Sequence, residues 1–113
     1  TSPIDIGAGA FIAPGVCLAC SGHSVDAAQR TVGIGTSAPI TLGRDVWIGA
    51  NATVCGGVTI GKGSVIGAGS VVTRSIPPRT FAAGNPCRVI REITEADSMV
   101  NHPERLGGSR PKD

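Results

Sequence analysis

Aliphatic residues recur at a fixed spacing of six positions along most of this chain. Nine of them share one phase: Ile6, Ile12, Leu18, Leu42, Ile48, Val54, Ile60, Ile66 and Val72. The series is interrupted at Ser24, Arg30 and Thr36 and then resumes without a shift. A period of six fits neither an amphipathic helix nor a half-buried strand. Self-similarity at a fixed short period therefore indicates an architecture of stacked repeats.

Small and β-branched residues stand two positions before each aliphatic residue, as at Ile4, Ala10, Ser64 and Ser70. They suit a second inward position near a corner. Glycine follows the aliphatic residue in five cases, and we expect these glycines to take positive φ at tight corners: Gly7, Gly43, Gly49, Gly61 and Gly67. The pattern predicts a hexapeptide β-helix whose coils of about 18 residues stack at strand spacing. A β-sandwich with Gly-rich turns would need strand signals every 8 to 12 residues.

Composition narrows the class of protein further. The chain has 113 residues, enough for one domain and about three and a half coils, which favours oligomerisation. A net charge of +2 without a basic run argues against a nucleic-acid partner. We find no long apolar stretch and no signal peptide, so we expect a cytoplasmic protein without a membrane partner.

The four cysteines are expected to be reduced: Cys17, Cys20, Cys55 and Cys87. Cys17 and Cys20 have the spacing of a zinc-binding pair but lack a second pair, so no metal is expected.

The chain divides into four parts. The coils run from residue 4 to 19 and from 39 to 75, and residues 20–38 form an extruded loop, a length that is commonly functional. Ile76-Pro77-Pro78 is expected to end the coils, because proline cannot donate to a ladder. Residues 81–93 are expected to form a strand-turn-strand lid over the open end.

Residues 1–93 thus form the predicted domain, and residues 94–113 a short helix capped at Thr94 and a frayed polar tail. The chain begins Thr1-Ser2-Pro3 with its repeat already running at Ile6, which leaves open whether coils N-terminal to this one are missing.

Five segments carry a resemblance to a known family: Ser21-Gly22-His23-Ser24-Val25-Asp26, Pro39-Ile40-Thr41-Leu42-Gly43-Arg44-Asp45-Val46-Trp47-Ile48-Gly49, Gly57-Val58-Thr59-Ile60-Gly61, Val65-Ile66-Gly67-Ala68-Gly69-Ser70-Val71-Val72-Thr73 and Ala83-Gly84-Asn85-Pro86-Cys87-Arg88-Val89-Ile90. Together they resemble the galactoside, maltose and nodulation O-acetyltransferases of the hexapeptide-repeat acyltransferase superfamily. The resemblance covers residues 4–93. It implies an all-β, left-handed parallel β-helix, which departs from the usual right-handed crossover. It also implies a homotrimer with its active sites between subunits.

The resemblance implies that acetyl-CoA donates an acetyl group to a hydroxyl of a sugar or similar polyol. His23 corresponds to the general base, whose ordinary pKa of about 6.5 leaves neutral imidazole available near neutral pH. The oxyanion donor is expected to be a backbone N–H of the coil that carries Trp47 and Gly49. Trp47 is expected beside the acceptor, or as a packing residue at a subunit interface. Asp26 either contacts the acceptor or stabilises the loop through an Asx turn. His102, in the polar tail, is given no role.

For the co-substrate, the resemblance implies a groove at Gly49, Ala50, Ala68 and Thr73, where small side chains allow pantetheine to approach. Arg74, Arg88 and Arg91 correspond to cations near the CoA phosphates, for which arginine forks are suited.

Departures from the family pattern leave the acceptor open. The family has an Asn and a carboxylate on the coil before the first one seen here, which this chain starts too late to contain, and the loop before Pro39 lacks the aromatic residue that the family usually has there. The alternatives are an N-acetyltransferase acting on an amino sugar or antibiotic, and a truncated, non-catalytic β-helix that only assembles. A trimeric carbonic anhydrase would need three histidines per metal, and this chain has two.

Overall fold

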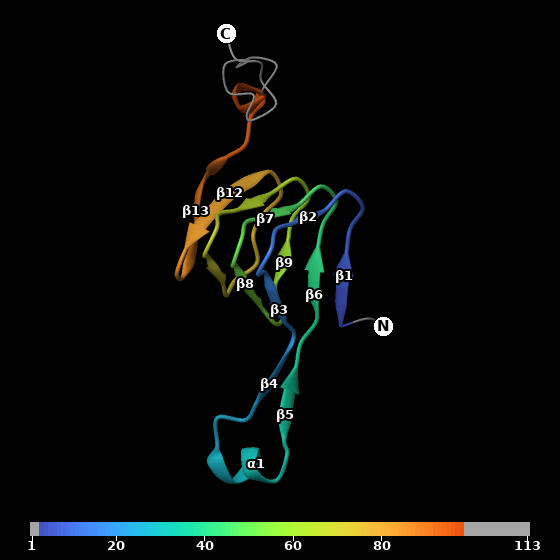
Figure 1. Cartoon of the computed structure of the whole chain (residues 1–113), viewed down its shortest axis with the longest axis vertical. Helices are drawn as coiled ribbons and strands as arrows, with labels where there is room; N and C mark the ends of the chain where they lie inside the picture. The colour runs from blue at the N-terminus through green and yellow to red at the C-terminus, as the bar shows by residue number, and fades with distance from the viewer. Residues whose placement is uncertain (1–2, 99–113) are drawn as a thin grey trace.

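Short parallel strands wind into a triangular coil in the computed structural model, which describes residues 3–98 (Figure 1). The first sheet contains β1 (Ile4–Ile6), β6 (Ile40–Leu42) and β9 (Thr59–Ile60). The second contains β2 (Phe11–Ile12), β7 (Trp47–Ile48), β10 (Val65–Ile66), β12 (Thr80–Gly84) and β13 (Cys87–Glu92). The third contains β3 (Cys17–Ala19), β8 (Thr53–Cys55) and β11 (Val71–Val72). This arrangement is the predicted parallel β-helix.

The strand register explains the period of six. Trp47 pairs with Val65 and Thr53 with Val71, so successive coils are 18 residues apart. Ile12 pairs with Ile48, which is twice that separation, and the difference is the extruded segment. The coil thus has three edges. Two of them are named here. The second–third edge joins the second sheet to the third and comes after β7 and β10 along the chain. The third–first edge joins the third sheet to the first and comes after β3, β8 and β11.

The predicted inward residues form the core of the second and third coils. Leu42, Ile48, Val54, Ile60, Ile66 and Val72 are at most 1% exposed. The positions two residues earlier, including Val46 and Ala52, are also buried. In the first coil the same positions are open, with Ile6 49% and Ile12 40% exposed.

The prediction that the corner glycines have positive φ was wrong. Gly43 and Gly49 do not have positive φ; the left-handed residues stand three positions after the aliphatic residue, at Asp45, Asn51, Gly63 and Gly69 among others. The earlier glycines are needed for close approach, since a Cβ at Gly43 would lie 2.7 Å from the backbone N of Lys62 on the next coil. Stacking distance, rather than backbone conformation, requires them.

The extruded segment is an arm with secondary structure of its own, which the sequence did not predict. β4 (Ser21–His23) and β5 (Gly35–Ser37) pair antiparallel, and α1 (Ala27–Thr31) closes the tip. In Figure 1 the arm projects downward from the coils, whereas β12 and β13 lie at the upper left of the coils. It leaves from the third–first edge, between β3 and β6.

The coil continues past the two prolines expected to end it. Ile76 bridges to Ile60, and β12 pairs parallel to β10 with Val65 opposite Phe81. β12 and β13 then form the predicted strand-turn-strand, as a hairpin that extends the second sheet. The side chain of Ser64 ties the proline segment to the coil: its Oγ donates to Pro77 O at 2.6 Å and accepts from Thr80 N at 3.0 Å.

The C-terminal part of the described chain ends in η1 (Glu95–Asp97), the predicted short helix, which is a 3₁₀ turn. The side chain of Thr94 caps it as expected. The predicted polar tail and His102 lie outside the described residues.

Candidate functional site

An aromatic row crosses the outer face of the second sheet. Phe11, Trp47, Val65 and Phe81 are register partners on β2, β7, β10 and β12, and register partners share a face. Each precedes a residue that points toward the coil axis, so each points outward. Trp47 is 52% exposed and Phe11 72%. The row holds both Phe and the Trp of a chain without Tyr. All three stand directly before an inward position, and this shared place in the repeat is the sequence signal by which the row could have been found.

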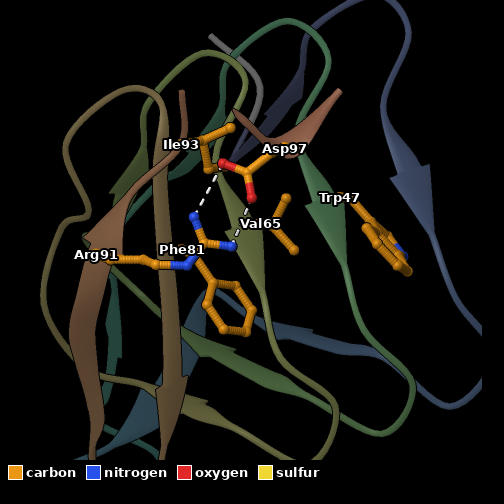
Figure 2. Close-up of a pocket in the computed structure, with 6 residues that line it drawn as sticks. All are labelled: Trp47, Val65, Phe81, Arg91, Ile93 and Asp97. Carbon is orange, nitrogen blue, oxygen red and sulfur yellow. Dashed lines mark hydrogen bonds and ion pairs between the residues drawn. The ribbon is translucent and has the colours of Figure 1, made fainter. Parts of the chain in front are cut away.

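Two adjoining hollows lie along this row. The ion-pair pocket, of about 380 Å³, is lined by Trp47, Val65, Phe81, Arg91, Ile93 and Asp97 (Figure 2). The corner groove, of about 520 Å³, shares Trp47, Val65 and Phe81 and extends onto the second–third edge, where its walls include Gly49, Ala50 and Ala68. The structure thus brings together four of the predicted site residues, Trp47, Gly49, Ala50 and Ala68, at the corner groove and places a fifth, Arg91, in the ion-pair pocket. It adds Phe81 to both hollows, and Ile93 and Asp97 to the ion-pair pocket.

Closely stacked backbone forms the part of the corner groove that lies on the second–third edge. Gly49 N donates to Ile66 O, and Gly69 N donates to Ala50 O, each at 2.8 Å, so two corners stack directly. A Cβ at Gly49 would lie 2.6 Å from Ala68 N. The small side chains of Ala50 and Ala68 leave this floor open to a thin, extended ligand.

The same hydrogen bonds narrow the choice of oxyanion donor. Trp47 N donates to Ser64 O at 3.0 Å and Gly49 N to Ile66 O, so these two N–H groups serve the ladder. Within residues 3–98, the backbone bonds of this corner do not use the N–H of Ala50. Ala50 is therefore the candidate donor within the coil that carries Trp47 and Gly49; among the described residues, these backbone bonds also leave the N–H of Ala68 on the next coil unused.

Arg91 is held by an ion pair at the mouth of the ion-pair pocket. Its NH1 and NH2 donate to Oδ2 and Oδ1 of Asp97 at 2.9 and 2.6 Å, and its guanidinium carbon lies 5.9 Å from the Phe81 ring centroid (Figure 2). The hydrogen bond and charge of Asp97 raise the pKa of Arg91 above its ordinary value, so Arg91 stays cationic.

A bulge places both arginines of β13 on the outer face. Phe81 pairs with Arg91 and Ala83 with Arg88, although the arginines are an odd number of residues apart. Strict alternation would put them on opposite faces. The register shift between Phe81 and Ala82 corrects the phase, so two cations flank the end of the second sheet.

His23 lies on the arm, exposed, and pairs with Gly35 in the β4–β5 ladder. The backbone beyond it is fixed by Arg30, whose NH1 donates to Ser24 O at 3.2 Å and Val25 O at 3.3 Å. Asp26 caps α1, since its Oδ1 accepts from Gln29 N at 3.0 Å. This bond provides the loop-stabilising role considered for Asp26, as a helix cap rather than an Asx turn.

The predicted site residues fall into two groups within one chain. Trp47, Gly49, Ala50 and Ala68 gather at the corner groove, with Arg88 and Arg91 beyond it on the hairpin. His23, Asp26, Thr73 and Arg74 belong to the arm and to the turn after β11, on the third–first edge. Within one chain, His23 and the corner groove therefore lie on different edges of the coil.

The described residues offer neither a metal cluster nor a membrane span. Across positions 3–98, no group of three or more His, Cys, Asp or Glu could hold a metal ion. In the same range, every helix is too short or too polar to cross a membrane.

Known proteins match this chain in sequence and in structure. The family described as Bacterial transferase hexapeptide (six repeats) matches residues 39–74. Galactoside O-acetyltransferase of Escherichia coli (strain K12) is 53% identical over 94 residues, which are 83% of this chain and 46% of that protein. Nodulation protein L of Rhizobium meliloti (strain 1021) is 46% identical over 76% of this chain and 47% of its own length. The chain thus spans about half the length of these relatives.

Solved structures agree with the fold. A galactoside acetyltransferase in complex with coenzyme A matches with a TM-score of 0.81 and 53% identity, over 83% of this chain and 47% of that one. A maltose O-acetyltransferase from Clostridium difficile 630 matches with a TM-score of 0.78 and 49% identity, over 81% and 49%. The expected left-handed β-helix is confirmed by these neighbours.

Proposed function

We propose that this chain, which belongs to the hexapeptide-repeat acyltransferases, transfers an acetyl group from acetyl-CoA to a hydroxyl of a sugar or similar polyol. The observation that carries the proposal is the corner groove, a backbone-floored channel beside Trp47 on the edge of the coil. Relatives named for O-acetylation of galactosides and maltose, one of them with coenzyme A bound, support the reaction class.

The groove would hold the pantetheine arm over Gly49, Ala50 and Ala68. Arg88 and Arg91, on the outer face of β13, would meet the phosphates with planar donor forks. Thr73 and Arg74, in the turn after β11, would add further contacts to the co-substrate.

His23 would act as the general base. As the acceptor oxygen attacks the thioester carbonyl carbon, the imidazole removes the hydroxyl proton, and the resulting oxyanion is met by the N–H of Ala50. Collapse of the tetrahedral intermediate breaks the C–S bond and leaves an acetyl ester. The departing CoA sulfur takes the proton back from His23. No metal has a step in this scheme.

The two groups of site residues favour a homotrimer with composite sites. The groove lies on the second–third edge and the arm on the third–first edge, so a site needs the groove of one copy and His23 of a neighbour. Cyclic packing of identical subunits brings different edges of neighbouring copies together at every interface. In this arrangement Trp47 would stand at the interface and beside the acceptor at once.

Reducing conditions suit this protein, and we place it in the cytoplasm. All four cysteines are free in the structure, including the exposed Cys17. Disulfides would be expected to form among accessible thiols in an oxidising compartment.

A transfer assay with His23→Ala tests the proposal. The release of CoA thiol is followed with a panel of sugars and with matching amino sugars. We expect wild-type turnover with hydroxyl acceptors and a loss of about 10²- to 10⁴-fold in kcat for the variant. His102→Ala, at the chain's other histidine, is the control and should retain full activity.

Full activity of His23→Ala on every accepted acceptor would refute the role of the base. Turnover with amines alone would instead identify an N-acetyltransferase. A folded trimer without turnover on any acceptor would point to an assembly role.

A further inference from the structure

Arg91 already has an anionic partner of the shape that a phosphate would offer. Both terminal nitrogens donate to the Asp97 carboxylate, and NH1 also donates to Glu92 O at 3.2 Å. Three of the five N–H groups of the guanidinium are thereby engaged. A phosphate that used the same two nitrogens would occupy the position of the carboxylate.

Asp97 is brought to this position by a short, ordered turn. Thr94 N donates to Asp97 Oδ2 at 2.9 Å, and Thr94 Oγ1 accepts from Ala96 N. Ile93 N donates to Arg79 O at 2.8 Å, which anchors the start of the segment. Ile93 and Asp97 both line the ion-pair pocket, so the turn is part of its wall (Figure 2).

We infer that Asp97 is a built-in competitor for Arg91, which a phosphate-bearing ligand must displace before Arg91 can bind it. The carboxylate then lowers the affinity for the anion, and binding releases residues 94–97 from the pocket wall. That the ligand is acetyl-CoA rests on the proposed function; the competition itself does not.

The exposure of the pair makes displacement feasible. The side chain of Arg91 is 53% exposed and that of Asp97 27%. Exposed ion pairs contribute little to stability, so a multiply charged phosphate can outcompete a single carboxylate. The alternative to competition predicts the opposite effect on binding. If a phosphate used the other edge of the guanidinium, Asp97 would be a positioning residue, and its removal would weaken phosphate binding.

Asp97→Asn separates these two roles. Asn keeps an oxygen that can accept from Thr94 N, so the turn is retained while the charge is lost. Glu92→Gln is the matched control, because it removes one negative charge from the neighbouring position of β13, whose side chain belongs to the other face. Asp97→Glu keeps the charge and serves as the conservative variant.

The test is calorimetric binding of acetyl-CoA and, separately, of inorganic pyrophosphate to the full chain. We expect Asp97→Asn to bind both about three- to tenfold more tightly than wild type, with Glu92→Gln and Asp97→Glu near wild type. Hydrogen exchange of residues 93–98 should also rise when pyrophosphate binds to wild type. Unchanged or weaker binding by folded Asp97→Asn would overturn the inference.

The two ligands keep this inference distinct from the proposed function. If wild type binds pyrophosphate but not acetyl-CoA, the proposed function fails while the competition is still measured. If acetyl-CoA binds and Asp97→Asn does not tighten it, the competition fails while the proposed function stands. Failure of pyrophosphate to bind either wild type or Asp97→Asn would overturn the competition as well.

Discussion

Ile12 and Ile48 are direct register partners in the second sheet, yet Ile48 is fully buried while Ile12 is 40% exposed. Ile48 has a coil on either side of it, whereas among the described residues Ile12 has a coil on one side. The same residue type in the same position of the repeat thus contributes differently to the free energy of unfolding in the two coils.

Truncation of the two side chains should therefore differ in cost. Ile48→Ala leaves a cavity between two coils and should lower the free energy of unfolding by about 3 kcal/mol. Ile12→Ala should cost about 1 kcal/mol or less, because part of the side chain is already in water. Urea titration of both variants measures the difference, and equal costs would contradict the view that the first coil is open in this chain.

Ser64 should matter far more than Ser75, although both accept a backbone hydrogen bond. Ser64→Ala leaves Pro77 O and the buried Thr80 N without their partner and should cost about 2 kcal/mol. Ser75 accepts from Thr59 N on the surface, where water can replace it, so Ser75→Ala should cost about 0.5 kcal/mol or less. Thermal unfolding compares the two, and a greater loss for Ser75→Ala would show that the hairpin is not held as described.

The repeat could be predicted from the sequence because every coil repeats the same requirement. One inward position of each hexapeptide must be aliphatic, so Ile48 and Ile66 mark the coil without knowledge of the fold. The reason for the glycines could not be predicted in the same way. Gly43 lies against Lys62, and such a contact exists only once the coils are stacked.

The site was predictable in part, for a similar reason. Gly49, Ala50 and Ala68 were assigned through the resemblance, and the structure groups them. Asp97 escaped notice because it appears in the sequence as part of a helix cap, and its bond to Arg91 depends on the path of the chain after β13. The bulge that aligns Arg88 with Arg91 likewise has no local signal.

Cys87 should make stability fall with pH in the alkaline range. Burial raises the pKa of its thiol above the ordinary value of 9.0, against a smaller lowering by the Ser70 hydrogen bond. As the pH rises through about 9, the thiol ionises in the unfolded chain before it does so in the folded one, which favours unfolding. Wild type should lose more stability than Cys87→Ala between neutral and alkaline pH, by denaturant titration at each pH. Parallel curves would contradict this.

Ala68→Leu should fill the corner groove without disturbing the core. The side chain of Ala68 is exposed at the corner, so the larger residue projects into the groove. Acetyl-CoA affinity should fall about tenfold or more, because the ligand would clash with the new side chain. Ala28→Leu, the same change on α1 of the arm, should leave affinity unchanged. Calorimetry measures the acetyl-CoA affinity of both variants. Undiminished binding to Ala68→Leu would show that the ligand does not bind in this groove.

Mixing two impaired variants tests the composite site most directly. His23→Ala retains the groove and Ala68→Leu retains the base, so each alone should be strongly impaired in acetyl transfer when acetyl-CoA is kept well below saturation. If the two are unfolded together in equal amounts and refolded, a site that joins two copies should recover about one quarter of wild-type activity through random assembly. Activity no greater than that of the separate variants, in a mixture shown to be oligomeric, would contradict a site shared between subunits.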